Sequence, residues 1–229
     1  MKALRIFVPA ALCFFLGYPL AAQDILRGEA RVDVEPAYMA WLGQSLPADD
    51  DALYGWALEE TALSFSAMIY GWNFDYEPGD RVRGLAENLN LQAQGSIQTN
   101  DPRLAVDSAK RDGHDFSMWA DYKLDTTQRH RITSWNAAGS MEIQAGGRGA
   151  LTGSAGNTER VRVKAAALED AARAAIRARL KTVELNRPRR VRGKIALAAF
   201  PICGIENGQW AVKARFRLIV ENVEHYVLY

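Results

Sequence analysis

Two clusters of arginines are the residues whose type and spacing most directly suggest chemistry in this sequence. The string Arg-Val-Arg-Gly occurs at residues 81–84 and again at residues 190–193. Guanidinium groups present forked N–H donors that match the oxygens of phosphates and carboxylates. The sequence therefore predicts an anion-binding surface formed by Arg187, Arg189, Arg190, Arg192, Arg81 and Arg83.

A second interpretation of these arginines is structural, and we favour it. At the start of a strand, both arginines of each string would share one face and the valine would take the other. We then expect Val82 and Val191 to be buried beneath the helix of their own unit. The arginines would face solvent or the acidic first turn of a neighbouring helix, where they would form ion pairs within the chain.

Charge is unevenly distributed along the chain. Residues 159–194 contain 12 basic and 4 acidic side chains, whereas residues 24–60 contain 2 basic and 9 acidic ones. The chain as a whole has 28 Lys and Arg against 27 Asp and Glu, and this near-neutral balance argues against nucleic acid as a partner. The basic stretch fits an envelope component such as a protein, an anionic lipid or a wall polymer, or it pairs with the acidic first segment.

Two of the six tryptophans are candidates for stacking on sugars. Trp72 and Trp135 each flank a polar loop. An indole ring offers a large apolar face together with a polar N–H group. The alternative for both residues is a place in the core, where tryptophans are mostly found.

No motif for catalysis or metal binding is present. The three histidines are too far apart in sequence for a local zinc motif, and Glu59-Glu60 are neighbours on a predicted helix, so that their side chains diverge by about 100°. Neither G-x-S-x-G nor H-E-x-x-H occurs. The sequence thus predicts no catalytic residues, no metal and no cofactor, and it leaves enzymatic activity open while favouring a protein that is not an enzyme.

The first 22 residues have the pattern of a secretory signal peptide. Lys2 and Arg5 precede an apolar run over residues 6–20, and small residues follow at Ala21 and Ala22. The run is about 15 residues long, short of the roughly 20 that span a bilayer. We therefore expect cleavage near Ala22 and a periplasmic or exported chain that has no transmembrane helix after cleavage. The alternative is that this segment remains as a membrane anchor. Of the two cysteines, the mature chain would keep only Cys203, for which we expect a buried structural role.

The sequence also indicates an internal duplication. Residues 57–60 (Ala-Leu-Glu-Glu) match residues 167–170 (Ala-Leu-Glu-Asp), and Pro78 matches Pro188. The two Arg-Val-Arg-Gly strings follow in the same order. Each copy begins with apolar residues at helical spacing, which predicts one helix ending near Gly71 and another over about residues 165–181.

Alternating apolar residues predict strands around these helices. A first strand is expected over residues 30–34. Asp112-Gly113 and Asn207-Gly208 are dipeptides of two-residue hairpin turns. After each turn one strand face is apolar, and its members are Phe116, Met118, Ala120, Tyr122 and Leu124 in the first copy and Trp210, Val212, Ala214, Phe216 and Leu218 in the second.

These patterns predict an α+β fold of two duplicated helix–strand–hairpin units, with an antiparallel sheet and helices packed on one face. The expected organisation is a signal peptide (1–22), a first unit with an extra N-terminal strand (23–144), a Gly-rich linker or loop (145–157) and a second unit (158–229). The predicted function is a non-catalytic binding or scaffolding module of the cell envelope. An envelope-polymer hydrolase with spatially assembled carboxylates and a small outer-membrane β-barrel are the alternatives.

Overall fold

The computed structural model describes residues 24–33, 50–112, 115–136, 139–149, 160–183, 188–207 and 209–226. In these ranges the chain forms three helices and nine strands, which confirms an α+β fold with antiparallel sheets. In chain order the elements are β1 (Ile25–Asp33), α2 (Asp50–Ile69), β2 (Trp72–Glu77), β3 (Asn88–Ala93), β4 (Leu104–Asp112), β5 (Asp115–Lys123), α3 (Thr126–Ser134), β6 (Met141–Gly149), α4 (Arg160–Val183), β7 (Arg190–Leu197), β8 (Ile202–Glu206) and β9 (Gln209–Glu224).

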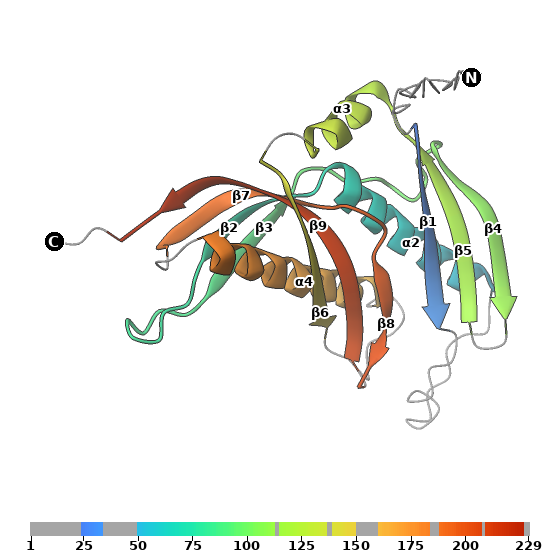
Figure 1. Ribbon diagram of the computed structural model, residues 1–229. Helices are drawn as coiled ribbons and strands as arrows, with labels where there is room; N and C mark the ends of the chain where they lie inside the picture. The colour runs from blue at the N-terminus through green and yellow to red at the C-terminus, as the bar shows by residue number, and fades with distance from the viewer. Residues whose placement is uncertain are drawn as a thin grey trace, which may run out of the picture.

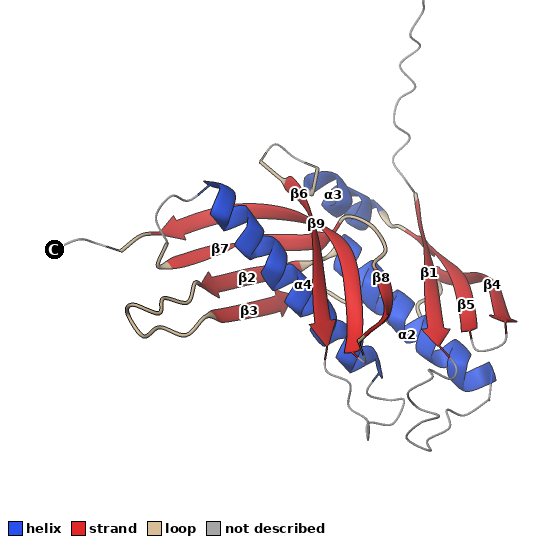
Figure 2. Cartoon of the chain, turned by 60° about the horizontal axis from the view of Figure 1, so that its bottom comes forward, coloured by secondary structure: helices blue, strands red, loops and turns tan. Residues whose placement is uncertain are grey.

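The strands form two antiparallel sheets, each packed against a long helix. The first sheet has the order β1-β5-β4 and lies against α2. The second has the order β3-β2-β7-β9-β6, with β8 also paired to β9, and it curves around α4 (Figures 1 and 2). Because β2 and β3 precede the predicted linker and β6–β9 lie at or after it, the second sheet draws strands from both predicted units.

The core of the first sheet follows the predicted alternation. All five expected residues of β5 and its C-terminal flank, from Phe116 to Leu124, are buried, as are Ala30 and Val32 of β1. They pack against Phe65 and Ile69, which recur at helical spacing on α2. The helix ends where Gly71 adopts φ +62°, a conformation that favours glycine and turns the chain directly into β2.

The core of the second sheet also has the predicted face, since Trp210, Val212, Ala214, Phe216 and Leu218 are all buried. The Gly-rich segment before it is a correction, because residues 145–149 belong to β6 and are not a linker. A Cβ on Gly147 would lie 2.1 Å from the Ala167 carbonyl oxygen, so glycine is what allows α4 to approach this strand closely. Residues 150–157 of the predicted linker lie outside the described residues.

One side chain connects the two sheets. Residues 198–201 form an irregular corner between β7 and β8, and Phe200 at this corner points to the first sheet. Its ring packs edge-on against Phe65, with 5.6 Å between centroids, and lies directly over Gly28 of β1. At the far end of the hairpin, Asn207 has φ +52°, as expected for the predicted turn.

The predicted duplication is not confirmed. Residues 81–84 form an exposed turn between β2 and β3, where Val82 is 96% exposed, whereas residues 190–193 lie in β7 and Val191 is buried. The expectation for Val191 is therefore confirmed and that for Val82 is wrong. The matched strings occupy different local structures, although β2 and β7, the strands that follow α2 and α4, pair antiparallel with each other.

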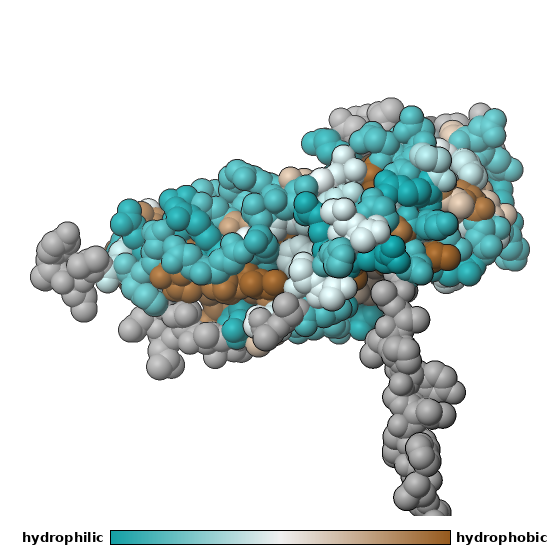
Figure 3. Space-filling view, turned by 90° about the horizontal axis from the view of Figure 1, so that it is seen from above, coloured by the Kyte–Doolittle hydropathy of each residue, from teal (hydrophilic) through white to brown (hydrophobic). Residues whose placement is uncertain are grey.

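The surface is mostly polar. In the view from above, apolar residues gather in a band on the side of the molecule that carries the C-terminus and in smaller patches on the opposite side (Figure 3). Most large apolar side chains lie instead in the two cores, one between the first sheet and α2 and one between the second sheet and α4. Because ligand sites are usually concave and mostly apolar, cavities near the boundary of these cores are candidate binding sites.

Candidate functional site

The arginines of β7 contact carboxylates on the neighbouring strands. Asp75 of β2 accepts two hydrogen bonds from Arg190 and one, at 3.3 Å, from Nε of Arg192. Arg192 also lies 3.2 Å from Glu224 of β9. Hydrogen bonds from Arg190 hold the pKa of Asp75 below its usual value. The expected ion pairing within the chain is thus present, but the partners lie on β2 and β9 and not on the first turn of a helix.

The other predicted anion-binding residues lie near the same end of the second sheet. Arg83 stacks on the ring of Tyr226, 3.7 Å from its centroid, and lies 3.8 Å from Asp80. Arg81 and Arg189 are exposed, and Arg187 lies outside the described residues. Arg83, Arg190 and Arg192 are each engaged by a carboxylate of the same chain, so a surface anion would have to compete with these ion pairs.

The two candidate tryptophans have different environments. Trp135 is buried, and its indole N–H donates to the Ile69 carbonyl at the end of α2. It also packs beside Gly71, so it has a structural role at the C-terminal end of α2. Trp72 is partly buried at the start of β2 and lines a cavity.

A cavity of about 340 Å³ lies where the two sheets meet. We call it the junction cavity. Apolar side chains from both cores form much of its wall, namely Leu63, Leu168, Phe200, Pro201 and Val212. Polar and charged residues complete the lining, namely Glu29, Arg31, Glu60, Ser64 and Lys164. Since α2, α4, β1 and the corner before β8 all contribute, the site exists only when both halves of the fold are assembled.

A buried ion pair forms one side of the junction cavity. Glu60 on α2 and Lys164 on α4 are 6% and 3% exposed, and the Lys164 ammonium donates a hydrogen bond to the Glu60 carboxylate. Lys164 also donates to the Arg31 carbonyl on β1, at 3.4 Å. Arg160 lies one turn earlier on α4, with its Nε 3.6 Å from Glu60. Charges are costly to bury unless they are paired, so this pair fixes α2, α4 and β1 relative to one another.

Trp210 of β9 lies beneath the two cations. The Arg160 guanidinium carbon is 4.6 Å and the Lys164 nitrogen 4.8 Å from the centroid of the indole ring. Cations over an aromatic face are attracted by the ring quadrupole. The indole therefore stabilises positive charge at a place where solvent is largely excluded.

Cys203 of β8 also lines the junction cavity. Burial raises the pKa of its thiol to about 11, and nearby Lys164 lowers it only in part. A thiol with this pKa stays protonated at neutral pH and is a poor nucleophile. The residue therefore acts as part of the cavity wall.

A second depression of about 330 Å³ continues the site along β1 and β8. Glu29, Arg31 and Cys203 line both spaces, and Asp115 and Ser117 of β5 add polar groups to the second. Glu29 contacts Arg31, at 2.9 Å, where the two spaces adjoin, whereas the Glu60–Lys164 pair lines the junction cavity alone. The second depression is thus mostly polar, and the junction cavity combines apolar side chains with one buried ion pair.

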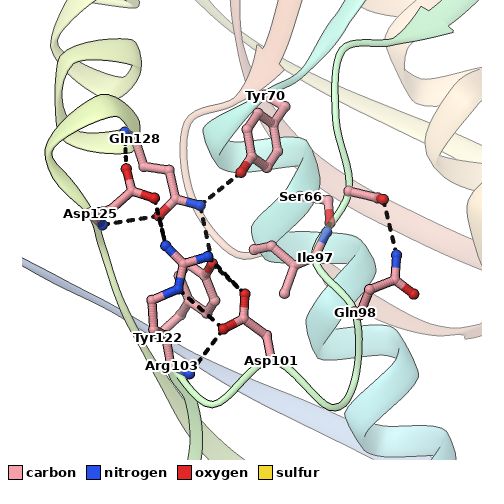
Figure 4. Close-up of polar contacts among 10 residues, drawn as sticks. Ser66, Tyr70, Ile97, Gln98, Asp101, Arg103, Tyr122, Asp125 and Gln128 are labelled. Atoms are coloured by element: carbon pink, nitrogen blue, oxygen red, sulfur yellow. Dashed lines mark hydrogen bonds and ion pairs between the residues drawn. The ribbon is translucent and has the colours of Figure 1, made fainter.

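A polar network near the C-terminal end of α2 connects the elements around it (Figure 4). Arg103 binds Asp101 through two nitrogens and donates to Asp125 at 2.6 Å. Gln128 of α3 is 2% exposed and donates to the hydroxyls of Tyr70 and Tyr122. The arginine hydrogen bonds lower the pKa of Asp101 to about 2. These contacts fasten the loop before β4 and helix α3 to the first sheet.

Sequence reasoning missed both α3 and the junction cavity. Helix α3 has a sequence signal that could have been used, because Asp125 and Gln128 form a capping box three residues apart. The Glu60–Lys164 pair has none, since its members are 104 residues apart in sequence. In the sequence, Glu60 was recognised only as the neighbour of Glu59 on a predicted helix.

The part of the chain that the structure describes contains no group of three or more His, Cys, Asp or Glu side chains placed to hold a metal ion. Among the described helices, none is long and apolar enough to cross a membrane.

Comparisons with curated proteins and with solved structures found no match. One family model, to which no function is attached, matches residues 17–226. The chain therefore belongs to a protein family of unknown function, whose model covers nearly the whole sequence.

Proposed function

We propose that this chain is an exported protein of the cell envelope that works as a non-catalytic binding module, with its ligand held in the junction cavity. The observation that carries the proposal is the cavity itself, an apolar space of about 340 Å³ with a buried ion pair on its wall. Small-molecule sites have this character, being concave, mostly apolar and supplied with a few convergent polar groups.

The lining supports a small amphipathic ligand. Leu63, Leu168 and Val212 offer apolar surface for a hydrocarbon chain or ring. The polar mouth at Glu29 and Arg31 suits a hydrogen-bonding head group that remains near solvent. Membrane lipids, their fragments and wall precursors of the envelope combine these two characters.

The contacts at the cavity favour binding over hydrolysis. A hydrolase of the predicted alternative type needs two carboxylates that face a substrate, one of them protonated. Here Glu29 contacts Arg31 and Glu60 contacts Lys164, so both carboxylates are engaged by cations of the same chain and do not form a pair that faces a substrate. Cys203, with its raised pKa, does not supply a nucleophile either.

A cavity-filling substitution tests the binding site. Ser64 is buried on α2 and lines the cavity, so Ser64→Phe should place a ring in it. We expect the wild-type mature chain to bind the amphipathic dye 1-anilinonaphthalene-8-sulfonate at one saturable site and Ser64→Phe to weaken this binding about tenfold or more. Ser134→Phe, on the exposed side of α3, is the matched control and should bind as the wild type does.

Near-ultraviolet circular dichroism of each variant shows whether the dye meets a folded protein. Equal dye affinity in folded wild-type and Ser64→Phe protein would exclude the junction cavity as the binding site. Native mass spectrometry of the mature chain after incubation with an envelope lipid extract then identifies the ligand. We expect an adduct on the wild type that Ser64→Phe lacks.

Export is tested separately from binding. When the full chain is produced in a diderm bacterial host, we expect it in the periplasmic fraction with an N-terminus near Gln23 and no lipid. Intact-protein mass spectrometry measures both properties. A chain that retains Met1, or one that carries lipid on Cys13, would contradict this part of the proposal.

A further inference from the structure

Another cavity, of about 380 Å³, lies between α2 and the loop formed by residues 94–99. We call it the Trp72 pocket. It shares Leu63 with the junction cavity, but its remaining lining is different. Its apolar surface is formed by Leu63, Trp72, Ile97, Val161 of α4 and the alanines 62, 67 and 93. The site is independent of the proposed function, because no residue of the buried ion pair reaches it.

The polar lining of the Trp72 pocket consists of hydroxyl, amide and carboxylate groups. Ser66, Ser96, Gln98 and Thr99 carry uncharged polar side chains, and Glu59 is exposed at the pocket. None of the described residues that line it is Lys, Arg or His. A phosphate or carboxylate ligand would therefore meet no positive side chain among these described residues and would be repelled by Glu59.

Hydrogen bonds hold the loop of this pocket in place, although it has no regular secondary structure (Figure 4). The hydroxyl of Ser66 on α2 accepts a hydrogen bond from the Ile97 N–H at 2.8 Å, and Gln98 donates to the Ser96 hydroxyl at 3.2 Å. Gly95 lies against the ring of Tyr70, where a Cβ would be 2.7 Å from the ring. The loop side of the Trp72 pocket is therefore preorganised.

Trp72 is positioned by the end of α2. The positive φ of Gly71 turns the chain into β2, and Trp135 packs on this turn while donating to Ile69. On β2, Trp72 is in register with Ala93 of β3, which also lines the pocket. The indole thus lies on a rigid strand and not on a mobile loop, as a stacking platform requires.

We propose that the Trp72 pocket binds an uncharged saccharide. A pyranose ring has C–H groups on its faces and hydroxyls around its edge, so one face can pack on the indole while the hydroxyls meet Glu59, Gln98 and the hydroxyl side chains. A carboxylate acceptor and an amide match vicinal hydroxyls, which both donate and accept. The absence of basic lining residues among those described selects against acidic sugars.

Indole N–H signals in ¹H–¹⁵N NMR spectra of the mature chain provide the test. The probes are N,N′-diacetylchitobiose, which is uncharged, and N-acetylmuramic acid, which carries a carboxylate on a similar ring. Trp72→Phe identifies the Trp72 signal by its loss. We expect diacetylchitobiose to shift that signal saturably and N-acetylmuramic acid to bind more weakly.

Three variants test the stacking contact, its control and the charge of the pocket. Trp72→Ala should weaken diacetylchitobiose binding about tenfold, the value of one aromatic contact, whereas Trp119→Ala, at an exposed tryptophan of β5, should leave it unchanged. Glu59→Gln, at an exposed position, should retain the fold and reduce the preference for the uncharged sugar. No saturable shift with diacetylchitobiose, a shift of another tryptophan alone, or equal binding of both probes would overturn the proposal.

Discussion

At the scale of single residues, the buried pair Glu60–Lys164 is the most consequential feature. It lies on the wall of the junction cavity and also joins α2 to α4 and, through the Arg31 carbonyl, to β1. A buried ion pair adds little net stability compared with apolar residues of similar size, but removing one partner leaves the other charge stranded. Its effect on stability therefore depends on which residue is removed.

Glu60→Leu should destabilise the fold by about 3–5 kcal/mol, because Lys164 remains buried without this carboxylate. Lys164→Met should cost less, since Arg160 still lies 3.6 Å from Glu60. The double variant should be more stable than Glu60→Leu alone. Urea unfolding measures all three, and Glu59→Leu, at the exposed neighbouring position, should change stability by no more than about 0.5 kcal/mol. Equal losses for Glu60→Leu and Glu59→Leu would show that the pair is not buried in solution.

Asp101 gives a residue-scale prediction for pH. Its pKa is lowered to about 2 by Arg103, so its contribution to stability is fully present above the unfolded pKa of 3.8 and is lost as pH falls towards 2. Because Arg103 is 36% exposed, solvent screening reduces this contribution to about 1 kcal/mol. Wild type and Asp101→Asn should therefore differ by about that amount at pH 6 and converge near pH 2. A constant difference over this range would contradict the assignment.

At the scale of secondary structure, β6 shows how a local pattern can mislead. The glycines at 146, 147 and 149 read as a linker because glycine is most often found where the chain needs conformational freedom. Here the cause is tertiary, since α4 packs its alanines directly onto the strand backbone. By contrast, the buried faces of β5 and β9 could be predicted. In both strands the buried positions alternate with more exposed ones, and the buried positions carry apolar residues in the sequence.

Two neighbouring glycines of β6 test this explanation. Gly147→Ala would place a Cβ 2.1 Å from the Ala167 carbonyl oxygen and 2.2 Å from the Ala171 nitrogen, both backbone atoms, so α4 must shift. We expect a loss of about 1–3 kcal/mol. Gly146→Ala meets only the Val212 carbonyl oxygen, at 3.5 Å, and should be neutral or slightly stabilising. Thermal unfolding of both variants decides the question, and similar melting temperatures would show that α4 does not pack against β6 this closely.

At the scale of the whole molecule, the α+β class was accessible from the sequence but the arrangement of strands was not. The matched Arg-Val-Arg-Gly strings suggested equivalent positions, yet one forms a turn and the other lies in β7. A short polar string has no fixed structure, and its environment is decided by partners such as Asp75, which lies 115 residues before Arg190. The junction cavity could not be predicted for the same reason, because residues from β1, α2, α4 and the β8–β9 region, which are far apart in the sequence, create it.

The relation between the two sheets can itself be tested at the contact of Phe200 with Gly28. A Cβ on Gly28 would lie 2.1 Å from the Phe200 ring, so Gly28→Ala should displace the corner between β7 and β8 and destabilise the protein. Phe200→Ala should cost about 2–3 kcal/mol, because it removes the ring that packs on Phe65.

In the double variant the added methyl group occupies space that the ring has vacated. The combined loss should therefore be smaller than the sum of the single losses by about 1 kcal/mol or more, as expected for residues in contact. Chemical denaturation of the four proteins completes this double-mutant cycle. Strict additivity would mean that Phe200 does not rest on β1 in solution, and the junction cavity, whose wall includes both Phe200 and β1, would then lack its closed form.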